Sequence, residues 1–284
     1  MSTSPITKHI RRFYDANTGL FLKFGQSSDG TIHRAIWGYG VEHGKEALHY
    51  VDELICKQIL GRHSDRQPLH LIDLGCGVAA SLCYIATQLP VTGLGITLSE
   101  EQCQLARTRI AKHKLSKTLQ CIRADFCQLP AGLKQADLAF AIESFVHAAS
   151  AERFLQQAAG IIKTGGHLII CDDFLRDDTV MQNTKAVKWI NRFRRGWLIP
   201  TLLTTGQLDQ YATLNGFKRI ETQDLTAFLQ IRRPRDYCIA LLIRILNHLA
   251  LKNPYLQMLY GGHALQICLK KQWLNHQFIV LEKI

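Results

Sequence analysis

The sequence lacks several signatures that mark common functional classes. Its nine cysteines include no Cys-x-x-Cys pair and follow no regular spacing, which argues against a zinc site and favours a reducing, cytoplasmic compartment. The first 20 residues contain basic side chains but no apolar run, so we expect no secretory signal. The most apolar stretch, residues 237–253, is interrupted by Arg244 and His248 and is shorter than the ~20 residues of a membrane-spanning helix.

The composition is that of a globular protein with a surplus of positive charge. At 284 residues the chain can form one large domain, or one domain with a cap, and 47% apolar residues are ample for a core. The formal net charge of +11 favours an anionic partner: a phosphorylated small molecule, a nucleic acid or an acidic membrane surface. The alternative is that the charge only solubilises the surface. Basic residues gather between Arg176 and Arg235, where few acids accompany them.

A buried strand, a glycine turn and a helix are predicted in immediate succession within residues 69–83, LHLIDLGCGVAASLC. This is the first unit of a doubly wound α/β sheet, whose ligand lies beyond the carboxyl end of the strand. Gly75 and Gly77 have no Cβ, so a ligand can approach their main chain. Ala80 stands where a dinucleotide fingerprint has its third glycine, and no Gly-Lys-Ser/Thr follows, which excludes a P-loop.

The motif Asp73-Leu-Gly-Cys-Gly resembles the glycine-rich motif of class I S-adenosylmethionine (SAM) methyltransferases. The resemblance implies that the carboxylate and the turn hold the methionine moiety of the cofactor. The residues that it assigns to this part are Asp73, Gly75, Cys76 and Gly77.

Two further stretches extend this resemblance. Residues 91–110 predict a strand, a turn and a helix that Ser99 caps, with the pattern Gly-Ile-Thr-Leu-Ser-x-x-Gln. This variant resembles the group that contains cyclopropane-fatty-acid synthases and the tocopherol and sterol C-methyltransferases. The resemblance implies that Thr97, the Leu98 backbone and Gln102 contact the ribose. After the strand predicted near 121–124 it implies that Asp125 accepts the adenine amino group and that Phe126 packs on the ring.

Residues 136–148 and 163–175 predict two more buried strands, with Glu143 and His147 at the end of the first and Asp172 and Asp173 at the tip of the second. The motifs follow one another in the order of the family. We therefore expect an α/β fold with the Rossmann-like, seven-stranded sheet of SAM methyltransferases. Within it we expect an N-terminal helical lid over residues 1–60 and a core over 61–284.

The N-terminal part contains an amphipathic helix over residues 5–24 and then the unusual segment 31–44, in which aromatic side chains alternate with His and Arg. The segment resembles the N-terminal lid of small-molecule C-methyltransferases, which closes over the substrate. The resemblance implies substrate contacts from Tyr14, His33, Arg34 and Trp37. The alternative is that the segment is a cap loop in which Trp37 only fills an edge of the core.

After the fifth strand the chain departs from a minimal core, and we expect cap segments at about 176–205 and 225–274. The first holds an aromatic-basic helix from which we expect Trp189 and Arg192 to face the substrate. The second is an insertion between two final antiparallel strands at the sheet edge, too long for a turn. We expect the apolar stretch within it to be a buried cap helix rather than a helix at a dimer interface or a membrane surface.

Methyl transfer from a sulfonium is an in-line displacement, so the protein mainly holds an electron-rich atom near the methyl group. Alkene acceptors become carbocations, which aromatic faces and a carboxylate stabilise. We predict that Glu143 is this base or cation stabiliser; the alternative is a solvated residue that opens a helix. His147 either shares the duty or caps the segment.

The whole pattern most resembles bacterial C-methyltransferases of isoprenoids. The basic surplus favours prenyl diphosphate substrates, for which Arg34, Arg192, Arg194 and Arg195 would hold the diphosphate together with Mg²⁺. The sequence itself assigns no certain metal ligand. We therefore predict C-methylation of a prenyl diphosphate or a related terpenoid by a cytoplasmic enzyme. The sequence leaves open whether the enzyme forms a homodimer.

Three alternatives remain. The first is a methyltransferase of another small molecule: a polyketide, a sterol, a fatty acyl chain or a phenol. The second is an RNA-binding methyltransferase, which the aromatic lid and the missing RNA-binding signatures disfavour, so we expect no nucleic-acid partner. The third is a non-catalytic subunit, which the intact cofactor motifs disfavour.

Overall fold

The computed structural model describes residues 5–24, 31–62, 68–231, 233–246 and 254–284. A seven-stranded sheet forms its centre, in the order β3-β2-β1-β4-β5-β7-β6. The first five strands are parallel, and β7 runs antiparallel to both of its neighbours. The strands are β1 (Leu69–Leu74), β2 (Val91–Thr97), β3 (Leu119–Arg123), β4 (Ala136–Ile142), β5 (Ile162–Leu175), β6 (Phe217–Asp224) and β7 (Leu274–Lys283). The predicted sheet is thereby confirmed, with its antiparallel edge pair.

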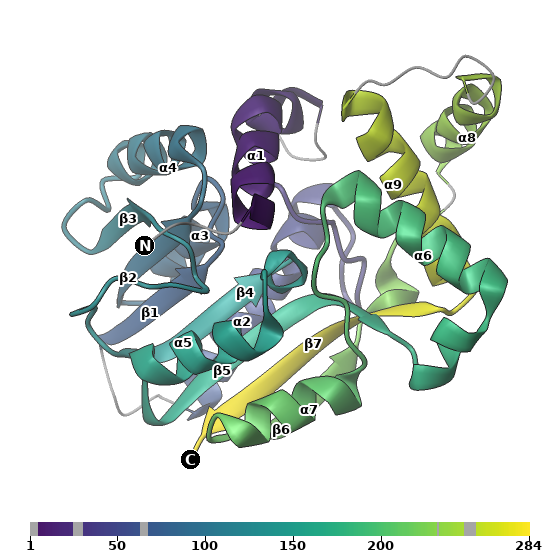
Figure 1. Ribbon diagram of the computed structural model, residues 1–284. Helices are drawn as coiled ribbons and strands as arrows, with labels where there is room; N and C mark the ends of the chain where they lie inside the picture. The colour runs from purple at the N-terminus through teal and green to yellow at the C-terminus, as the bar shows by residue number, and fades with distance from the viewer. Residues whose placement is uncertain (1–4, 25–30, 63–67, 232, 247–253) are drawn as a thin grey trace.

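Helices cover both faces of this sheet and its upper edge (Figure 1). They are α1 (Pro5–Phe24), α2 (Gly44–Arg62), α3 (Ala80–Gln88), α4 (Glu100–Lys112), α5 (Ala151–Ile161), α6 (Thr184–Trp197), α7 (Thr205–Leu214), α8 (Pro234–Leu246) and α9 (Pro254–Lys270). Short 3₁₀ turns lie at Phe145–His147, Asp178–Gln182 and Thr226–Phe228.

The central strands are apolar along their whole length because helices bury both of their faces. All six residues of β1 are buried. Leu69 and Leu71 pack in a cluster with residues of α2 and α3 behind the sheet. Ile72 and Leu74 point to the opposite face, where α5 and α7 cover them. Alternate side chains of one strand therefore serve two separate cores.

The helix starts follow the capping rules that the sequence predicts. Ser99 caps α4, where its Oγ accepts a hydrogen bond of 3.1 Å from the Gln102 backbone N–H. Thr204 and Gln207 form a reciprocal capping box at the start of α7. The helix predicted in the stretch 237–253 is α8, which begins at Pro234 and ends at Leu246, and residues 247–253 lie outside the described residues. The expected burial is wrong for this helix, because Tyr237 and Leu241 are 61% and 62% exposed.

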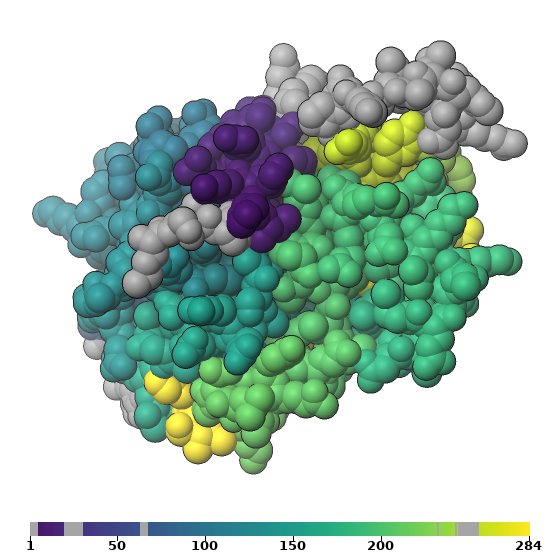
Figure 2. All heavy atoms as spheres, in the orientation of Figure 1, coloured from purple at the N-terminus to yellow at the C-terminus, as the bar shows by residue number. Residues whose placement is uncertain are grey.

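Three helices come together above the carboxyl ends of the parallel strands. There α6 and α9 cross at two glycines, because a Cβ on Gly196 would lie 2.5 Å from Gly261 Cα. The other partner is α1, whose Phe13 contacts Trp197 of α6 edge to face, with ring centroids 6.3 Å apart. In the space-filling view α1 (purple) lies against both the teal core and the green segment that contains α6 (Figure 2). These helices form the upper wall of the site.

Candidate functional site

A pocket of about 750 Å³ opens at the carboxyl ends of β1, β2 and β4. Its floor includes the glycine turn after β1 and the ends of the three strands, and α1, α6, α8 and α9 supply the walls. Most of the predicted site residues line it: Tyr14, His33, Arg34, Trp37, Asp73, Gly75, Cys76, Gly77, Thr97, Leu98, Gln102, Phe126, Glu143 and His147. Of these predicted residues, Tyr14 and His147 are 133 positions apart in the chain and still share one cavity.

The glycine turn has the backbone that its sequence predicts. Gly75 has a φ of +103° and Gly77 a φ of +50°, a region that other residues rarely adopt. The N–H groups of Gly75 and Cys76 both donate to the Ile96 carbonyl at 2.9 Å, which folds the turn over β2. A Cβ on Gly75 would lie only 2.3 Å from Ser144 Cβ, so no larger residue fits there.

Asp73, at the end of β1, is a buried carboxyl group in the lining of the pocket. Burial raises the pKa of its carboxyl well above the usual value, with the nearby charge of Asp52 adding to the effect. A cationic ligand in the pocket would reverse this shift. The ammonium and sulfonium groups of SAM are such cations, so the residue and the glycine turn beside it fit the methionine end of the cofactor.

Thr97, Ser99 and Gln102 form a linked polar group at the end of β2. Thr97 Oγ1 donates to Gln102 Oε1 at 2.8 Å. Ser99 Oγ donates to Asp15 Oδ1 at 2.6 Å, which ties α1 to the start of α4. Asp15 is a contact that the sequence did not suggest, since nothing in its local pattern distinguishes it from a solvated helix residue.

Only one of the two predicted adenine contacts lies in the pocket. Phe126 lines the pocket, whereas Asp125 lies outside the lining residues. Asp125 Oδ1 accepts a hydrogen bond from the Cys127 backbone N–H at 2.8 Å, which stabilises the bend after β3.

His147 is a buried imidazole whose tautomer is set by its neighbours (protonation inferred from partners). Its Nδ1 lies 3.3 Å from the Leu198 carbonyl, which can only accept, so Nδ1 carries the proton. Nε2 therefore carries a lone pair, which accepts a hydrogen bond of 2.8 Å from the Tyr14 hydroxyl. Burial lowers the pKa of His147 to about 4, so the ring is neutral near pH 7. Tyr14 stays a neutral phenol because burial, then the charges of Asp172 and Glu143, raise its pKa.

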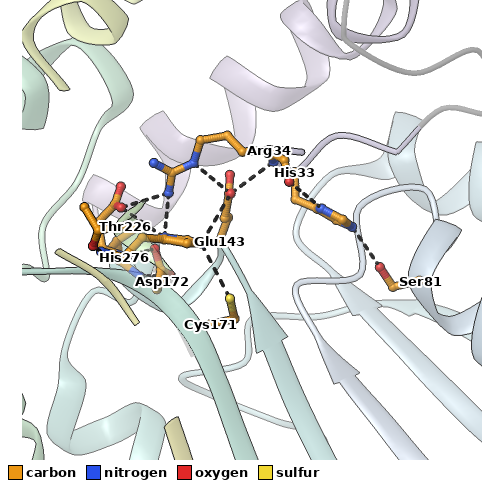
Figure 3. Close-up of polar contacts among 10 residues, drawn as sticks. His33, Arg34, Ser81, Glu143, Cys171, Asp172, Thr226 and His276 are labelled. Carbon is orange, nitrogen blue, oxygen red and sulfur yellow. Dashed lines mark hydrogen bonds and ion pairs between the residues drawn. The ribbon is translucent and has the colours of Figure 1, made fainter. Parts of the chain in front are cut away.

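Glu143 belongs to a second, partly buried cluster, which joins segment 31–37 to three strand tips (Figure 3). Its Oε1 accepts from the Arg34 backbone N–H at 3.0 Å and from Arg34 Nε at 2.8 Å. Arg34 Nη2 donates to Asp173 Oδ1 at 2.8 Å and reaches His276 Nδ1 at 2.9 Å. Glu143 has a φ of +48°, a strained backbone that these contacts hold in place.

The charges in this cluster keep two carboxylates ionised. Burial alone would raise the pKa of Glu143 and of Asp173, but the Arg34 guanidinium lowers both below their usual values. Asp172 points elsewhere and accepts from the Val146 backbone N–H at 3.1 Å. Burial, followed by the charge of Asp173, raises the pKa of Asp172 well above its usual value. The cluster thus holds two ionised carboxylates, Glu143 and Asp173, at the wall of the pocket.

His276 is a member of this cluster that sequence reasoning missed. It follows directly from register, since β5 and β7 pair antiparallel with Asp173 opposite His276. The only sequence signal for His276 was the prediction that the final strand is antiparallel. That prediction did not specify which residues of β5 and β7 lie opposite one another.

The remaining predicted substrate residues lie apart from the pocket. Trp189 and Arg192 are outside its lining, and Arg192 stacks on the rings of Trp189 and Tyr260 at 5.3 and 5.9 Å. Arg194 donates to the Ile199 and Pro200 carbonyls and closes the end of α6. Arg195 is exposed. These arginines therefore shape the cap helix rather than the cavity.

Comparison with known proteins agrees with the fold and the cofactor motif. Residues 72–170, from β1 into β5, match the family described as "Methyltransferase domain". The chain is a class I SAM-dependent methyltransferase. Among its relatives, the methyltransferase is similar to an O-methyltransferase of Pyrenophora dematioidea, with 28% identity over 221 residues that cover 78% of this chain and 79% of the relative.

Solved structures show the same fold at low identity. A cyclopropane synthase of Mycobacterium tuberculosis superposes with a TM-score of 0.75 at 17% identity, covering 99% of the methyltransferase and 100% of that chain. The geranyl diphosphate C-methyltransferase of Streptomyces coelicolor A3(2) superposes with a TM-score of 0.69 at 12% identity over 100% of both chains.

Two features are absent from the part of the chain that the structure describes. No group of three or more His, Cys, Asp or Glu side chains there has the geometry of a metal site. Among the same residues, no helix combines the length and the hydrophobicity that crossing a bilayer requires.

Proposed function

We propose that this methyltransferase transfers the methyl group of SAM to a hydroxyl group of an apolar small molecule, with His147 as the general base. The observation that carries the proposal is the state of His147: a neutral ring in the pocket, with Nδ1–H held by the Leu198 carbonyl and an Nε2 lone pair that accepts from the Tyr14 hydroxyl. Oxygen acceptors need such a proton acceptor, whereas alkene acceptors do not need one before methyl transfer.

The cofactor would lie along the floor of the pocket. Asp73 and the turn of Gly75 to Gly77 would hold its methionine end, and Thr97 and Gln102 would face its ribose. When bound, SAM supplies an electrophilic methyl group on a sulfonium. The bare main chain of the turn allows the close approach that positions this group beside the acceptor.

The protein's own chemistry is a single proton transfer. In the resting site Tyr14 donates to His147 Nε2, and an acceptor hydroxyl that enters the pocket takes this place. As the new C–O bond forms, the hydroxyl proton moves to Nε2. The resulting imidazolium keeps its Nδ1–H bond to Leu198, and the ionised Glu143 raises the proton affinity of the ring. Tyr14 itself is excluded as the base by its raised pKa.

The walls indicate the class of acceptor. The cavity of about 750 Å³ is within the ~300–1,000 Å³ of pockets that enclose drug-sized ligands. Trp37, Val146, Trp197, Leu259 and Leu265 line it beyond the strand tips. We infer an acceptor with an aliphatic or aromatic body and one hydroxyl, such as a terpenoid, polyketide or phenol. The name of the Pyrenophora relative, an O-methyltransferase, supports this choice.

C-methylation of a prenyl diphosphate or a related terpenoid is the second candidate. The ionised Glu143 beside aromatic walls favours it, because a carboxylate and ring faces stabilise a carbocation. The diphosphate is less well accommodated. Arg34 is neutralised by two carboxylates, and the arginines of α6 lie outside the cavity. Arg233 and Arg235 do line it, but both lie within 4 Å of the Asp236 carboxylate, at 3.7 and 3.9 Å. The described residues also lack an acidic cluster that would hold Mg²⁺.

The experiment that separates the two is incubation with labelled SAM and matched acceptors. One set carries a free hydroxyl on a terpenoid or polyketide skeleton, and the other consists of prenyl diphosphates with and without Mg²⁺. We expect label as a methoxy group, independent of Mg²⁺. Label on carbon of a prenyl diphosphate, with no label on any alcohol or phenol, would overturn the proposal in favour of the second candidate.

A further inference from the structure

Two cysteine thiols meet directly beneath the glycine turn. Cys76 is the middle residue of the turn, and Cys121 lies on β3, with β2 between them. Their sulfur atoms are nevertheless only 3.7 Å apart. The sequence distance of 45 residues gives no hint of this proximity.

A glycine on β2 makes the contact between them. Gly95 pairs with Asp73 of β1 on one side and with Cys121 of β3 on the other. A Cβ on Gly95 would lie 2.8 Å from Cys76 Sγ and 3.7 Å from Cys121 Sγ. The missing side chain therefore leaves a gap in the face of the sheet, and the Cys76 side chain fills it from above.

The pair also has the accessibility and reactivity that modification requires. Both residues are nearly buried, but Cys76 is part of the pocket lining, so a small oxidant that enters the pocket reaches it. Hydrogen bonds from the Cys76 and Cys103 thiols lower the pKa of the Cys121 thiol, although burial opposes them. The same hydrogen bond with Cys121, followed by burial, raises the pKa of the Cys76 thiol, so Cys121 is the more acidic partner of the pair.

We propose that Cys76 and Cys121 are an oxidation site at which peroxide produces an intramolecular disulfide that distorts the glycine turn. The disulfide depends only on the two thiols. Its effect on the enzyme rests on the proposed cofactor site, since the turn is where SAM would bind.

The chemistry balances with hydrogen peroxide as the oxidant. The Cys76 sulfur, which lines the pocket, attacks one peroxide oxygen, the O–O bond breaks, and hydroxide leaves and takes up the Cys76 thiol proton as water, so that Cys76 becomes a sulfenic acid. The Cys121 sulfur then attacks the Cys76 sulfur, the S–O bond breaks, and a second water leaves with the Cys121 proton. In total, two thiols lose two electrons and two protons, and one peroxide becomes two waters.

The geometric consequence follows from the bond length. The sulfur atoms must approach from 3.7 Å to about 2.05 Å. Cys121 is held in a paired strand, so most of the movement falls on Cys76 and the turn. This pulls on the hydrogen bond from Cys76 N–H to the Ile96 carbonyl and on the positive-φ glycines at either side. We therefore expect the oxidised protein to bind SAM more weakly, and bound SAM to slow the oxidation by covering Cys76.

The test is oxidation of the reduced protein with hydrogen peroxide, with and without a saturating amount of S-adenosylhomocysteine. We expect intact mass spectrometry to show the loss of two hydrogens and peptide mapping to locate the bond at Cys76–Cys121. Calorimetry should show SAM affinity reduced about tenfold or more, restored by dithiothreitol. The matched variants are Cys121→Ser, which should resist the mass loss and keep its SAM affinity, and Cys103→Ser, which should form the disulfide like the wild type.

Each other outcome overturns the proposal. No mass loss, a stable sulfinic acid, or a dimer linked through the exposed Cys238 would each show that the pair does not couple. If Cys121→Ser misfolds by circular dichroism, Cys121→Ala serves the same purpose. A reduced protein that binds no SAM would refute the proposed cofactor site alone, because the disulfide is detected by mass.

Discussion

Replacing His147 by Gln is the sharpest test of the proposed chemistry. Gln can still donate to the Leu198 carbonyl and contact the Tyr14 hydroxyl, but its amide cannot take a proton from an acceptor. A positioned general base contributes about 10²–10⁴ in rate. At about 1.4 kcal/mol per tenfold, the lost transition-state stabilisation is about 3–5 kcal/mol. We expect kcat to fall by this factor and the Kd for SAM to change by less than about twofold, since the hydrogen bonds of His147 go to Tyr14 and Leu198 and not to the glycine turn.

The same variant tests the burial of His147 through the pH dependence of stability. The native pKa of about 4 lies below the ordinary 6.5, so the unfolded chain binds a proton that the folded protein does not. The stability contribution of the neutral ring is complete above pH 6.5 and is lost as the pH falls towards 4. A shift of this size corresponds to roughly 3 kcal/mol of unfolding free energy. We expect urea denaturation to show this loss in the wild type and a smaller one in His147→Gln.

Two results would refute this reasoning. Turnover of a hydroxyl acceptor at more than about a tenth of the wild-type rate in His147→Gln would exclude His147 as the base. Parallel stability curves for the two proteins between pH 4 and pH 6.5 would show that the native imidazole titrates like an exposed one.

Three further predictions concern Arg34, Asp73 and Gly75. Arg34→Gln should give kcat/KM a new decline at acidic pH, because the pKa values of the two carboxylates it neutralises will rise; Arg62→Gln, which removes a surface ion pair, should leave the pH profile unchanged and cost at most about 1 kcal/mol. Asp73→Asn should weaken SAM binding about 10–100-fold by calorimetry. The same variant should not lower the melting temperature of the free protein at pH 7, because the raised pKa means that the ionised form opposes folding above the usual carboxyl pKa. Gly75→Ala should cost at least about 2 kcal/mol in urea denaturation, from strain and from the clash with its neighbour, whereas Gly40→Ala, where φ is +77° but no atom lies within 4 Å, should cost about 1 kcal/mol.

The backbone of the proposed cofactor half of the site could be predicted because its information is local. Residues 73–77 carry the acidic residue and the glycines of one turn, and residues 97–102 carry one helix start with its cap. Such short segments adopt their backbone for reasons internal to them: positive φ at glycine, and a side-chain oxygen at the helix N-terminus. The parallel strands were visible for a similar reason, since a strand buried on both faces is a continuous apolar run.

The acceptor half could be predicted only as a set of candidates. Glu143 and Arg34 were both expected to face the substrate, yet 109 residues separate two groups that form an ion pair of 2.8 Å. The arginines of α6 looked equivalent to Arg34 in the sequence. The helix turns Arg192 onto aromatic rings and Arg194 onto its own C-terminal carbonyls.

The sequence by itself determined the order of the strands along the chain, the glycine turn and the helix caps, because each depends on residues within one or two turns of one another. Only the tertiary structure decided the chemistry of the pocket. The tautomer of His147 depends on Leu198, its hydrogen-bond donor is Tyr14, and the contact of Cys76 with Cys121 depends on Gly95 lying between them. Each of these pairings joins distant segments whose register is set by the packing of the whole sheet, and local sequence patterns contain no record of that register.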